Sequence, residues 1–305
     1  MGGVIKTGLL LALLTGLFVV AGGLIGGRGG AVIALCIAGA MNLYAWWGSD
    51  QAVLRMQHAQ PVGPAEAPAL HALTARLAAR AGLPMPALYL IHEDQPNAFA
   101  TGRDPEHAAV AVTTGLLASL PEREVAGVVA HELAHIRHRD TLIMSVAATL
   151  AGGIGLLAQF GGLFAFRRGS RDNPLGIVGV LLAVIVAPLV AMIVQMAVSR
   201  SREYEADRRG AEIAGDPLGL AGALLHLEQG RAVPNHGATS ATAHLFIVNP
   251  FAGGLAGLFA THPATADRVA ALEAMAGQGV RAAPVVPSRK AGPWGGAPRR
   301  RGPWG

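Results

Sequence analysis

Four long stretches of this chain contain no charged residue, and they constrain its fold more than any other feature. They are Thr7 to Gly27, Gly29 to Trp47, Leu142 to Phe166 and Leu175 to Ser199, with 21, 19, 25 and 25 residues. A helix needs about 20 apolar residues to cross a bilayer. A large soluble core could bury such helices, but four of them in 305 residues are hard to bury without lipid. We therefore expect a mainly α integral membrane protein with four transmembrane helices.

The four runs pair into two hairpins. Arg28 alone separates the first two runs, and the first apolar core is too long for a cleaved signal peptide. Residues 167–174 separate the last two runs, and Pro188 predicts a kink that neighbouring helices can tolerate. The expected segments are an N-terminal transmembrane hairpin at 1–49, a soluble part at 50–141, a second transmembrane hairpin at 142–199, a second soluble part at 200–280 and a tail at 281–305.

The distribution of basic residues predicts the orientation. Two hairpins place residues 1–6, 48–141 and 200–305 on one side of the membrane. Within about ten residues of a span, that side has eight lysines and arginines, whereas the opposite side has four. Because cytoplasmic flanks carry the excess of Lys and Arg, we expect a multi-pass protein of the cytoplasmic (inner) membrane whose soluble parts face the cytoplasm.

Charge and cysteine content exclude several classes of protein. The chain has 24 basic and 19 acidic residues, but six of the basic ones and no acid lie in residues 281–305. The remaining body is nearly neutral, which argues against a nucleic-acid partner. The Pro- and Gly-rich tail is predicted to be disordered, with binding to anionic lipid head groups as an alternative to no function. Cys36 is the only cysteine, so disulfide frameworks and multi-cysteine metal sites are excluded.

The soluble segments combine helices with a small β-sheet. Short β-branched or apolar runs between turn residues predict strands at Ala87–Ile91, Asn97–Thr101 and Ala108–Thr113. Residues 119–122, Ser-Leu-Pro-Glu, form a capping box that should begin a helix running to about Arg139. Composition and stop signals predict further helices at 50–82, 200–214, 218–230 and 264–276. The soluble part is therefore expected to be an α+β domain.

A metal-binding motif lies on the predicted helix that follows the capping box. Residues 131–135 are His-Glu-Leu-Ala-His. His131 and His135 are one helical turn apart and project from one face, at a spacing that one Zn²⁺ can bridge. Glu132 lies beside them, where it can accept a proton from a metal-activated water as general base. The alternative is a surface helix with two solvated histidines.

A catalytic zinc needs a third protein ligand and an open position. The metzincin pattern would place glycine at 138 and histidine at 141, but these positions hold His138 and Thr141. His138 and Asp140 could each be considered as ligands, although helix-end roles suit them better, and Asp140 also suits the outer shell. Glu203 is the preferred third ligand, because Asp207 one turn later can receive the N–H of a liganding histidine. The alternative for this segment is a charged helix with surface ion pairs.

The combination of motifs resembles the M48 family of membrane metalloproteases, and within it the HtpX-type heat-shock proteases. The resemblance covers residues 5 to about 275. It rests on the HExxH motif, the following hydrophobic hairpin and Arg-Glu-Tyr-x-Ala-Asp at 202–207. It also rests on the segments 97–102 and 109–117, and on His262-Pro263 with Arg268. The resemblance implies a gluzincin-like zinc protease domain with one Zn²⁺ per chain, ligands His131, His135 and Glu203, and Glu132 as the base.

The resemblance also implies a membrane-bound zinc endopeptidase that hydrolyses misfolded or damaged membrane proteins in quality control and the stress response. Its partners would be protein or peptide substrates and the lipid bilayer. His262 is a candidate for stabilising the oxyanion, with a simple His-Pro turn as the alternative. Asn97 and Ala98 are candidates for substrate binding on an edge strand, although Asn97 could be only a turn residue after Pro96.

Two other functions are considered. One is a Ste24-like CAAX protease, for which four spans are too few to build a large intramembrane chamber. The other is a non-catalytic membrane scaffold with a vestigial zinc site, against which the intact Glu132 argues.

The second hairpin can be tested by cysteine labelling in intact cells. Single cysteines at Ser170 and Thr239 are introduced in a Cys36→Ala background. Because both ends of the second hairpin should lie in the cytoplasm, an impermeant reagent added outside should label position 170 and spare position 239. Equal protection of both positions would show that the hairpin does not cross the membrane, and labelling of 239 alone would invert the orientation.

Overall fold

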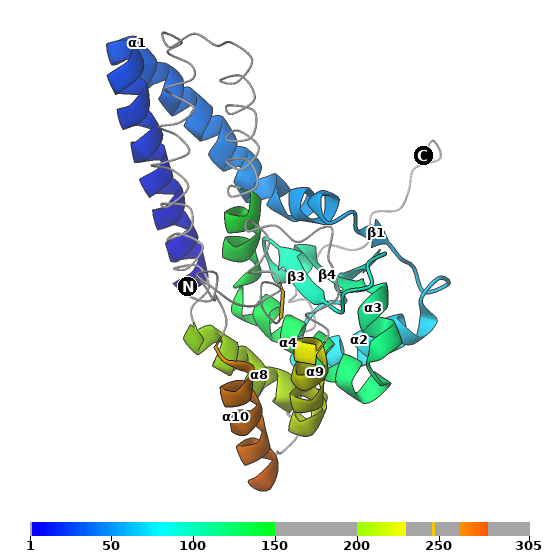
Figure 1. Cartoon of the computed structure of the whole chain (residues 1–305). Helices are drawn as coiled ribbons and strands as arrows, with labels where there is room; N and C mark the ends of the chain where they lie inside the picture. Colours follow the sequence, from blue (N-terminus) through cyan, green and yellow to red (C-terminus); the bar gives the residue numbers. More distant parts are fainter. Residues whose placement is uncertain (1, 150–199, 230–245, 248–262, 280–305) are drawn as a thin grey trace, which may run out of the picture.

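The computed structural model describes residues 2–149, 200–229, 246–247 and 263–279 (Figure 1). Most of the second predicted hairpin, His262 and the tail after 279 lie outside these residues. The helices and strands are α1 (Gly2–Met56), β1 (Gln60–Pro61), α2 (Pro68–Ala81), β2 (Ala87–Ile91), β3 (Ala98–Gly102), η1 (Pro105–His107), β4 (Ala108–Thr113), α3 (Thr114–Ser119), α4 (Glu122–His138), α8 (Arg200–Ala214), α9 (Pro217–Gln229) and α10 (Thr265–Gly277). Residues 141–149 are also helical.

α1 is a hairpin of two helical arms that meet at a glycine turn (Figure 1). Gly27 has φ 59° and ψ −146°, a conformation that favours glycine, and there the chain leaves the helix. Across the arms, Asn42 Nδ2 donates a hydrogen bond to Thr15 Oγ1 at 2.8 Å. A Cβ atom on Gly22 would lie 2.5 Å from a carbonyl oxygen of the facing arm, so the backbones meet where only glycine fits. The helical hairpin expected over the first two apolar runs is therefore present.

The second arm of α1, Gly26–Met56, has the length and composition of a helix that can cross a membrane. The first arm contributes a shorter apolar helix, Thr7–Val20. Large exposed apolar side chains are concentrated on α1, and include Leu9, Leu13, Val20, Val32, Ile33, Leu43 and Trp47. In the described part of the chain, only this one helix qualifies as a membrane span by these criteria, so four transmembrane helices stay a prediction.

The sheet has the strand order β1-β2-β4-β3. β2 and β4 are parallel, with Leu88 paired to Val110, and β3 runs antiparallel to β4. Two of the three predicted strands have the expected bounds, and the third is displaced by one residue, to Ala98–Gly102. β3 is an edge strand of this four-stranded sheet.

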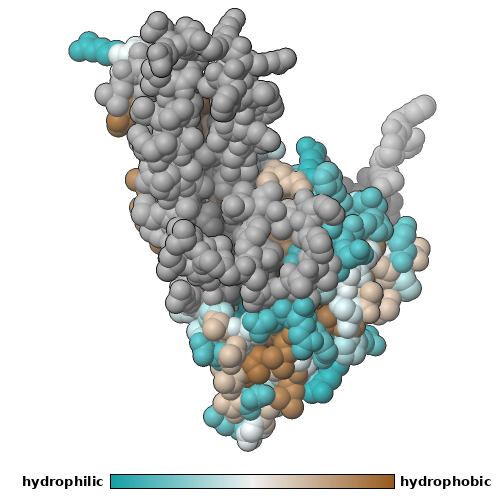
Figure 2. Space-filling model, viewed as in Figure 1, coloured by the Kyte–Doolittle hydropathy of each residue, from teal (hydrophilic) through white to brown (hydrophobic). Residues whose placement is uncertain are grey.

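The sheet is buried on both faces. On one face, Leu88, Ala100 and Val110 join the main core with α2 and α4. On the other, Phe99 and Ala111 pack in a second core with the end of α1 and the helix at 141–149. The sheet is thus held between the helical part of the domain and the descending arm of α1 (Figure 1). The visible surface of that helical part is mixed, with hydrophilic residues around a smaller hydrophobic area (Figure 2).

The prediction of one continuous helix over 50–82 is wrong for residues 57–67. α1 ends at Met56, β1 follows at Gln60–Pro61, and α2 begins only at Pro68. Pro61, Gly63 and Pro64 lie in this interval, and prolines in a helix interior remove hydrogen bonds and clash with the preceding turn. Residues 69–81 are helical as predicted.

The predicted capping box is also wrong. Ser119 ends a separate short helix, α3, where its Oγ donates to the carbonyl of Gly115 at 2.7 Å. α4 begins at Glu122 after Pro121, without a side-chain cap. The hydroxyl of Ser119 is therefore hydrogen-bonded within α3 and does not cap α4.

The helices α8, α9 and α10 lie within a residue of their predicted bounds (Figure 1). α8 and α9 pack against α4, and α10 packs against α9 and α8. A Cβ atom on Gly210 of α8 would lie 2.9 Å from the Cα of His131. This close approach brings α8 directly against the segment of α4 that carries the HExxH motif.

The glycine contact in α1 predicts the effect of a substitution. Gly22→Leu should separate the arms and lower the free energy of unfolding by about 1–3 kcal/mol, because the new side chain has no space. Thermal unfolding in detergent micelles measures this. Gly39→Leu is the control, since a Cβ atom there meets nothing within 4 Å. An equal effect of the two substitutions would contradict the contact.

Candidate metal centre

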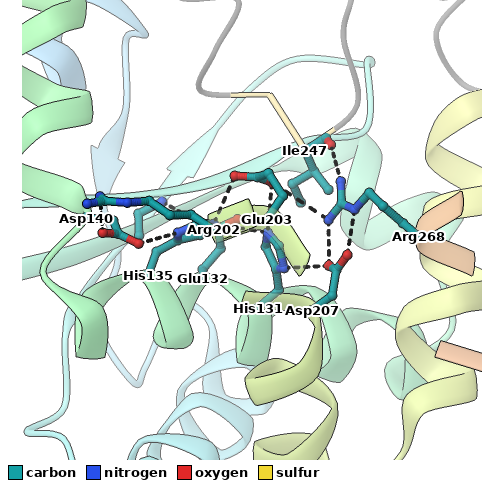
Figure 3. Close-up of polar contacts among 10 residues, drawn as sticks. His131, Glu132, His135, Asp140, Arg202, Glu203, Asp207, Ile247 and Arg268 are labelled. Atoms are coloured by element: carbon teal, nitrogen blue, oxygen red, sulfur yellow. Dashed lines mark hydrogen bonds and ion pairs between the residues drawn. The ribbon is translucent and has the colours of Figure 1, made fainter. Parts of the chain in front are cut away.

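Two helices bring the three predicted ligands together (Figure 3). α4 carries His131 and His135, whose Nε2 atoms lie 3.2 Å apart. α8 carries Glu203, whose Oε2 lies 3.9 Å from Nε2 of His131 and whose Oε1 lies 3.7 Å from Nε2 of His135. All three side chains are buried. Two histidine nitrogens and a carboxylate therefore converge on one point inside the domain.

This arrangement fits a metal ion. The donor atoms lie within 4.8 Å of one another, and among the described residues this is the one group of three such side chains that could hold an ion. Tetrahedral zinc with bonds of about 2.0–2.1 Å places its donors roughly 3.3–3.4 Å apart. The separation of the two imidazole nitrogens already matches this value. Three protein ligands also leave the fourth position of a tetrahedral ion open.

Two buried charged side chains, Asp207 and Arg268, support the imidazole of His131 at its Nδ1 atom. Nδ1 of His131 lies 3.0 Å from Oδ1 of Asp207 on α8. Arg268 of α10 donates to both carboxylate oxygens of Asp207, at 2.7 and 2.6 Å. Burial would raise the pKa of Asp207, but Arg268 and His131 outweigh it and keep that pKa below its usual value. An ionised Asp207 favours the proton on Nδ1 of His131, which leaves Nε2 free to bind a metal.

Glu132 lies next to the ligands and is 4% exposed. Its Oε2 accepts a hydrogen bond of 2.7 Å from the backbone N–H of Ala100 in β3. Burial raises the pKa of Glu132 to about 7, although the nearby His135 opposes this shift. A carboxylate with a pKa near neutrality can both accept and return a proton, as a general base requires.

The second histidine faces several acidic groups. Burial would lower the pKa of His135, but the carboxylates of Asp140, Glu203 and Glu132 outweigh it and raise that pKa to about 9. Counted together, four carboxylates of the centre face two guanidinium groups, those of Arg202 and Arg268. A metal ion binds the two imidazoles only in their neutral form. With the four carboxylates ionised, two negative charges would then remain for a divalent cation to neutralise.

The structure places only some of the other predicted site residues near the metal centre or in the described part of the chain. His138 does not belong to the described ligand group, and His262 lies outside the described residues. Ala98 is in the edge strand β3, and Asn97 directly precedes it. Both are buried, and Oδ1 of Asn97 accepts a hydrogen bond of 3.3 Å from the N–H of Ile247. Substrate binding by either residue stays a prediction.

Sequence reasoning missed three groups of the centre. The backbone donor at Ala100 has no side-chain signal. Arg202 directly precedes the predicted ligand, but its partner Asp140 is 62 positions away. Arg268 belongs to the family resemblance, but its role is not predicted, because its contact with Asp207 depends on tertiary packing. Only the spacing of Arg268 after the His-Pro pair at 262–263 could have drawn attention to it.

Taken together, a buried His-His-Glu group on two helices, with a glutamate beside the first histidine and a small sheet alongside, defines a metallopeptidase centre. The profile of peptidase family M48 matches residues 64–276, and the chain therefore belongs to that family.

The structure is also similar to the crystal structure of S. mikatae Ste24p, with 19% sequence identity and a TM-score of 0.43. That match covers 79% of this chain and 64% of the other, so this chain spans a little less than two thirds of the length of that protein.

The pKa of Glu132 predicts a pH-dependent stability of the metal-free protein. The carboxyl titrates at about 7 in the folded state against 4.5 as its ordinary value. Ionisation of Glu132 therefore leaves the free energy of unfolding unchanged below pH 4.5. Above pH 7 it lowers that free energy by the full difference between the two pKa values. Glu132→Gln removes this cost, and should raise the free energy of unfolding by up to about 3 kcal/mol at pH 8.

Denaturant unfolding in the presence of a chelator, at pH 4.5 and pH 8, measures this difference. At pH 4.5 the variant and the parent protein should be nearly equal. A gain of the same size at both pH values would contradict the raised pKa.

Proposed function

We propose that this chain is a membrane-bound zinc endopeptidase. The observation that carries the proposal is the convergence of His131, His135 and Glu203 beside Glu132 in a buried, negatively charged centre. His₂Glu is a ligand set of catalytic zinc, in which the fourth position is left for water or substrate. A structural zinc site would use a fourth protein ligand, and none joins this group among the described residues.

The residues of the centre have separate roles in hydrolysis. His131, His135 and Glu203 would hold zinc, which would supply Lewis acidity and lower the pKa of water. Glu132 would accept a proton from the attacking water and return it to the leaving amine, since its pKa near 7 allows both transfers. The N–H of Ala100 fixes the orientation of the Glu132 carboxylate. Asp207 and Arg268 hold the imidazole of His131 in the tautomer that binds the metal.

The proposed substrates are misfolded or damaged membrane proteins. Support comes from the exposed apolar α1, which packs directly on the sheet next to the centre. β3 supplies an edge against which an extended polypeptide could pair. We further propose, with the HtpX-type proteases, that the protein is a multi-pass protein of the inner membrane whose centre faces the cytoplasm, which the arginine and lysine distribution supports.

Hydrolysis is tested with detergent-solubilised protein loaded with zinc. The protein should cleave casein, and Glu132→Gln should lower the rate at least about 10³-fold, because the base is lost while the ligands stay. Glu205→Gln is the matched control, since Glu205 lies on α8 and pairs with Arg208 at the surface. Undiminished cleavage by Glu132→Gln, or none by the parent protein, would refute the proposed activity.

The ligand set is tested by metal content. Zinc measured by atomic absorption should be close to one per chain in the parent protein, and much lower after His131→Ala, His135→Ala or Glu203→Ala. His138→Ala should retain zinc, because His138 is outside the ligand group. Full zinc retention in Glu203→Ala would exclude it as the third ligand.

A further inference from the structure

A sharp turn after α4 places Asp140 next to Nδ1 of the second histidine, His135. Arg139 ends the helix in the left-handed conformation, with φ 57°. The N–H of Asp140 then donates to the carbonyl of His135 at 3.0 Å. The side chain of Asp140 is buried, and its Oδ2 lies 3.6 Å from Nδ1 of His135 (Figure 3).

The other carboxylate oxygen of Asp140 pairs with an arginine of α8. Arg202 donates from Nη1 to Oδ1 of Asp140, and this pair is mostly shielded from solvent. Arg202 lies in the first turn of α8 and directly precedes Glu203. The paired residues are 62 positions apart, and the third and fourth apolar runs occupy most of that interval.

The two histidines therefore have the same kind of support. Asp207 faces Nδ1 of His131 and is paired with Arg268. Asp140 faces Nδ1 of His135 and is paired with Arg202. Asp140 also begins the helix at 141–149, since its carbonyl accepts from the N–H of Met144. Helix capping alone does not require the charge, because asparagine caps as well as aspartate.

Resting on the proposed zinc site, we propose that the Asp140–Arg202 ion pair positions two of the three zinc ligands, His135 and Glu203. The pair also joins the two ends of the segment that contains the third and fourth apolar runs. The carboxylate of Asp140, 3.6 Å from Nδ1 of His135, favours the proton on that nitrogen, which leaves Nε2 for the metal. Arg202 fixes that carboxylate and, as the neighbour of Glu203, also fixes the start of α8. The pair is a positioning pair and does not touch substrate.

Zinc affinity of the full chain in detergent tests this role, with competition by a chromophoric chelator as the measurement. Asp140→Asn keeps the shape and the capping ability of the side chain but removes its charge, and Arg202→Gln removes the partner. Loss of an outer-shell partner typically weakens metal binding about 10- to 100-fold. Each variant should therefore raise the zinc dissociation constant at least about tenfold. The double variant should bind zinc no more weakly than the weaker-binding single variant, because both changes break the same interaction.

Arg209→Gln is the matched control, since Arg209 lies on the same helix but pairs at the surface with Glu205 and Glu212. It should bind zinc as the parent protein does. The visible spectrum of the Co²⁺-loaded protein is a second readout, and it should change in the two test variants but not in the control. If a variant folds only when loaded, its rate of zinc release to chelator is measured instead, with an acceleration of at least about tenfold expected.

The outcomes separate this inference from the proposed function. A parent protein that binds no zinc would refute the proposed function and the inference together. A parent protein that binds zinc, with parental affinity, spectrum and release rate in Asp140→Asn and Arg202→Gln, would overturn the inference alone. Additive losses in the double variant would show that the residues act separately, and would also overturn it.

Discussion

The contact between α4 and α8 is the interaction on which the rest of the structure depends. It is made possible by Gly210, which lets the backbone of α8 approach His131. The contact places Glu203 opposite the two histidines and Asp207 behind the first of them. Burying this many charges is costly unless each is paired. Here the arginines at 202 and 268 offset part of that cost, and the remaining negative charge is what a divalent cation would neutralise.

The sheet connects this centre to the apolar part of the chain. Alternate residues of β3 face opposite ways, so Ala100 packs toward α4 while Phe99 packs against the end of α1 and the helix at 141–149. Thr101 and Ser145 add a hydrogen bond of 2.6 Å between β3 and that helix. The strand that orients Glu132 is thus fixed by the same residues that anchor the apolar helices, and the two parts of the molecule share one structural unit.

Local patterns predicted much of this arrangement. The one-turn spacing of His131 and His135 needs only helix geometry. The same spacing between Glu203 and Asp207 predicted two carboxylates side by side, and both do lie next to His131. The two inner strands followed from short apolar runs. The capping role of Ser119 failed because α3 competes for its hydroxyl. Contacts such as Ala100 with Glu132 and Asp140 with Arg202 could not be predicted, since they depend on tertiary packing between distant segments.

The length of the second arm of α1 would set the distance between the metal centre and a bilayer that this arm spans. Its 31 residues, at 1.5 Å per residue, form a rod about 46 Å long. The hydrocarbon core is only about 30 Å thick, so an upright arm that spans it would extend roughly 16 Å beyond it. The last turns, which include the buried Val53 and Leu54, pack against the sheet and would then lie outside the lipid. Because an extended chain advances about 3.3 Å per residue, a membrane-anchored polypeptide would need only about five unfolded residues to cover that height.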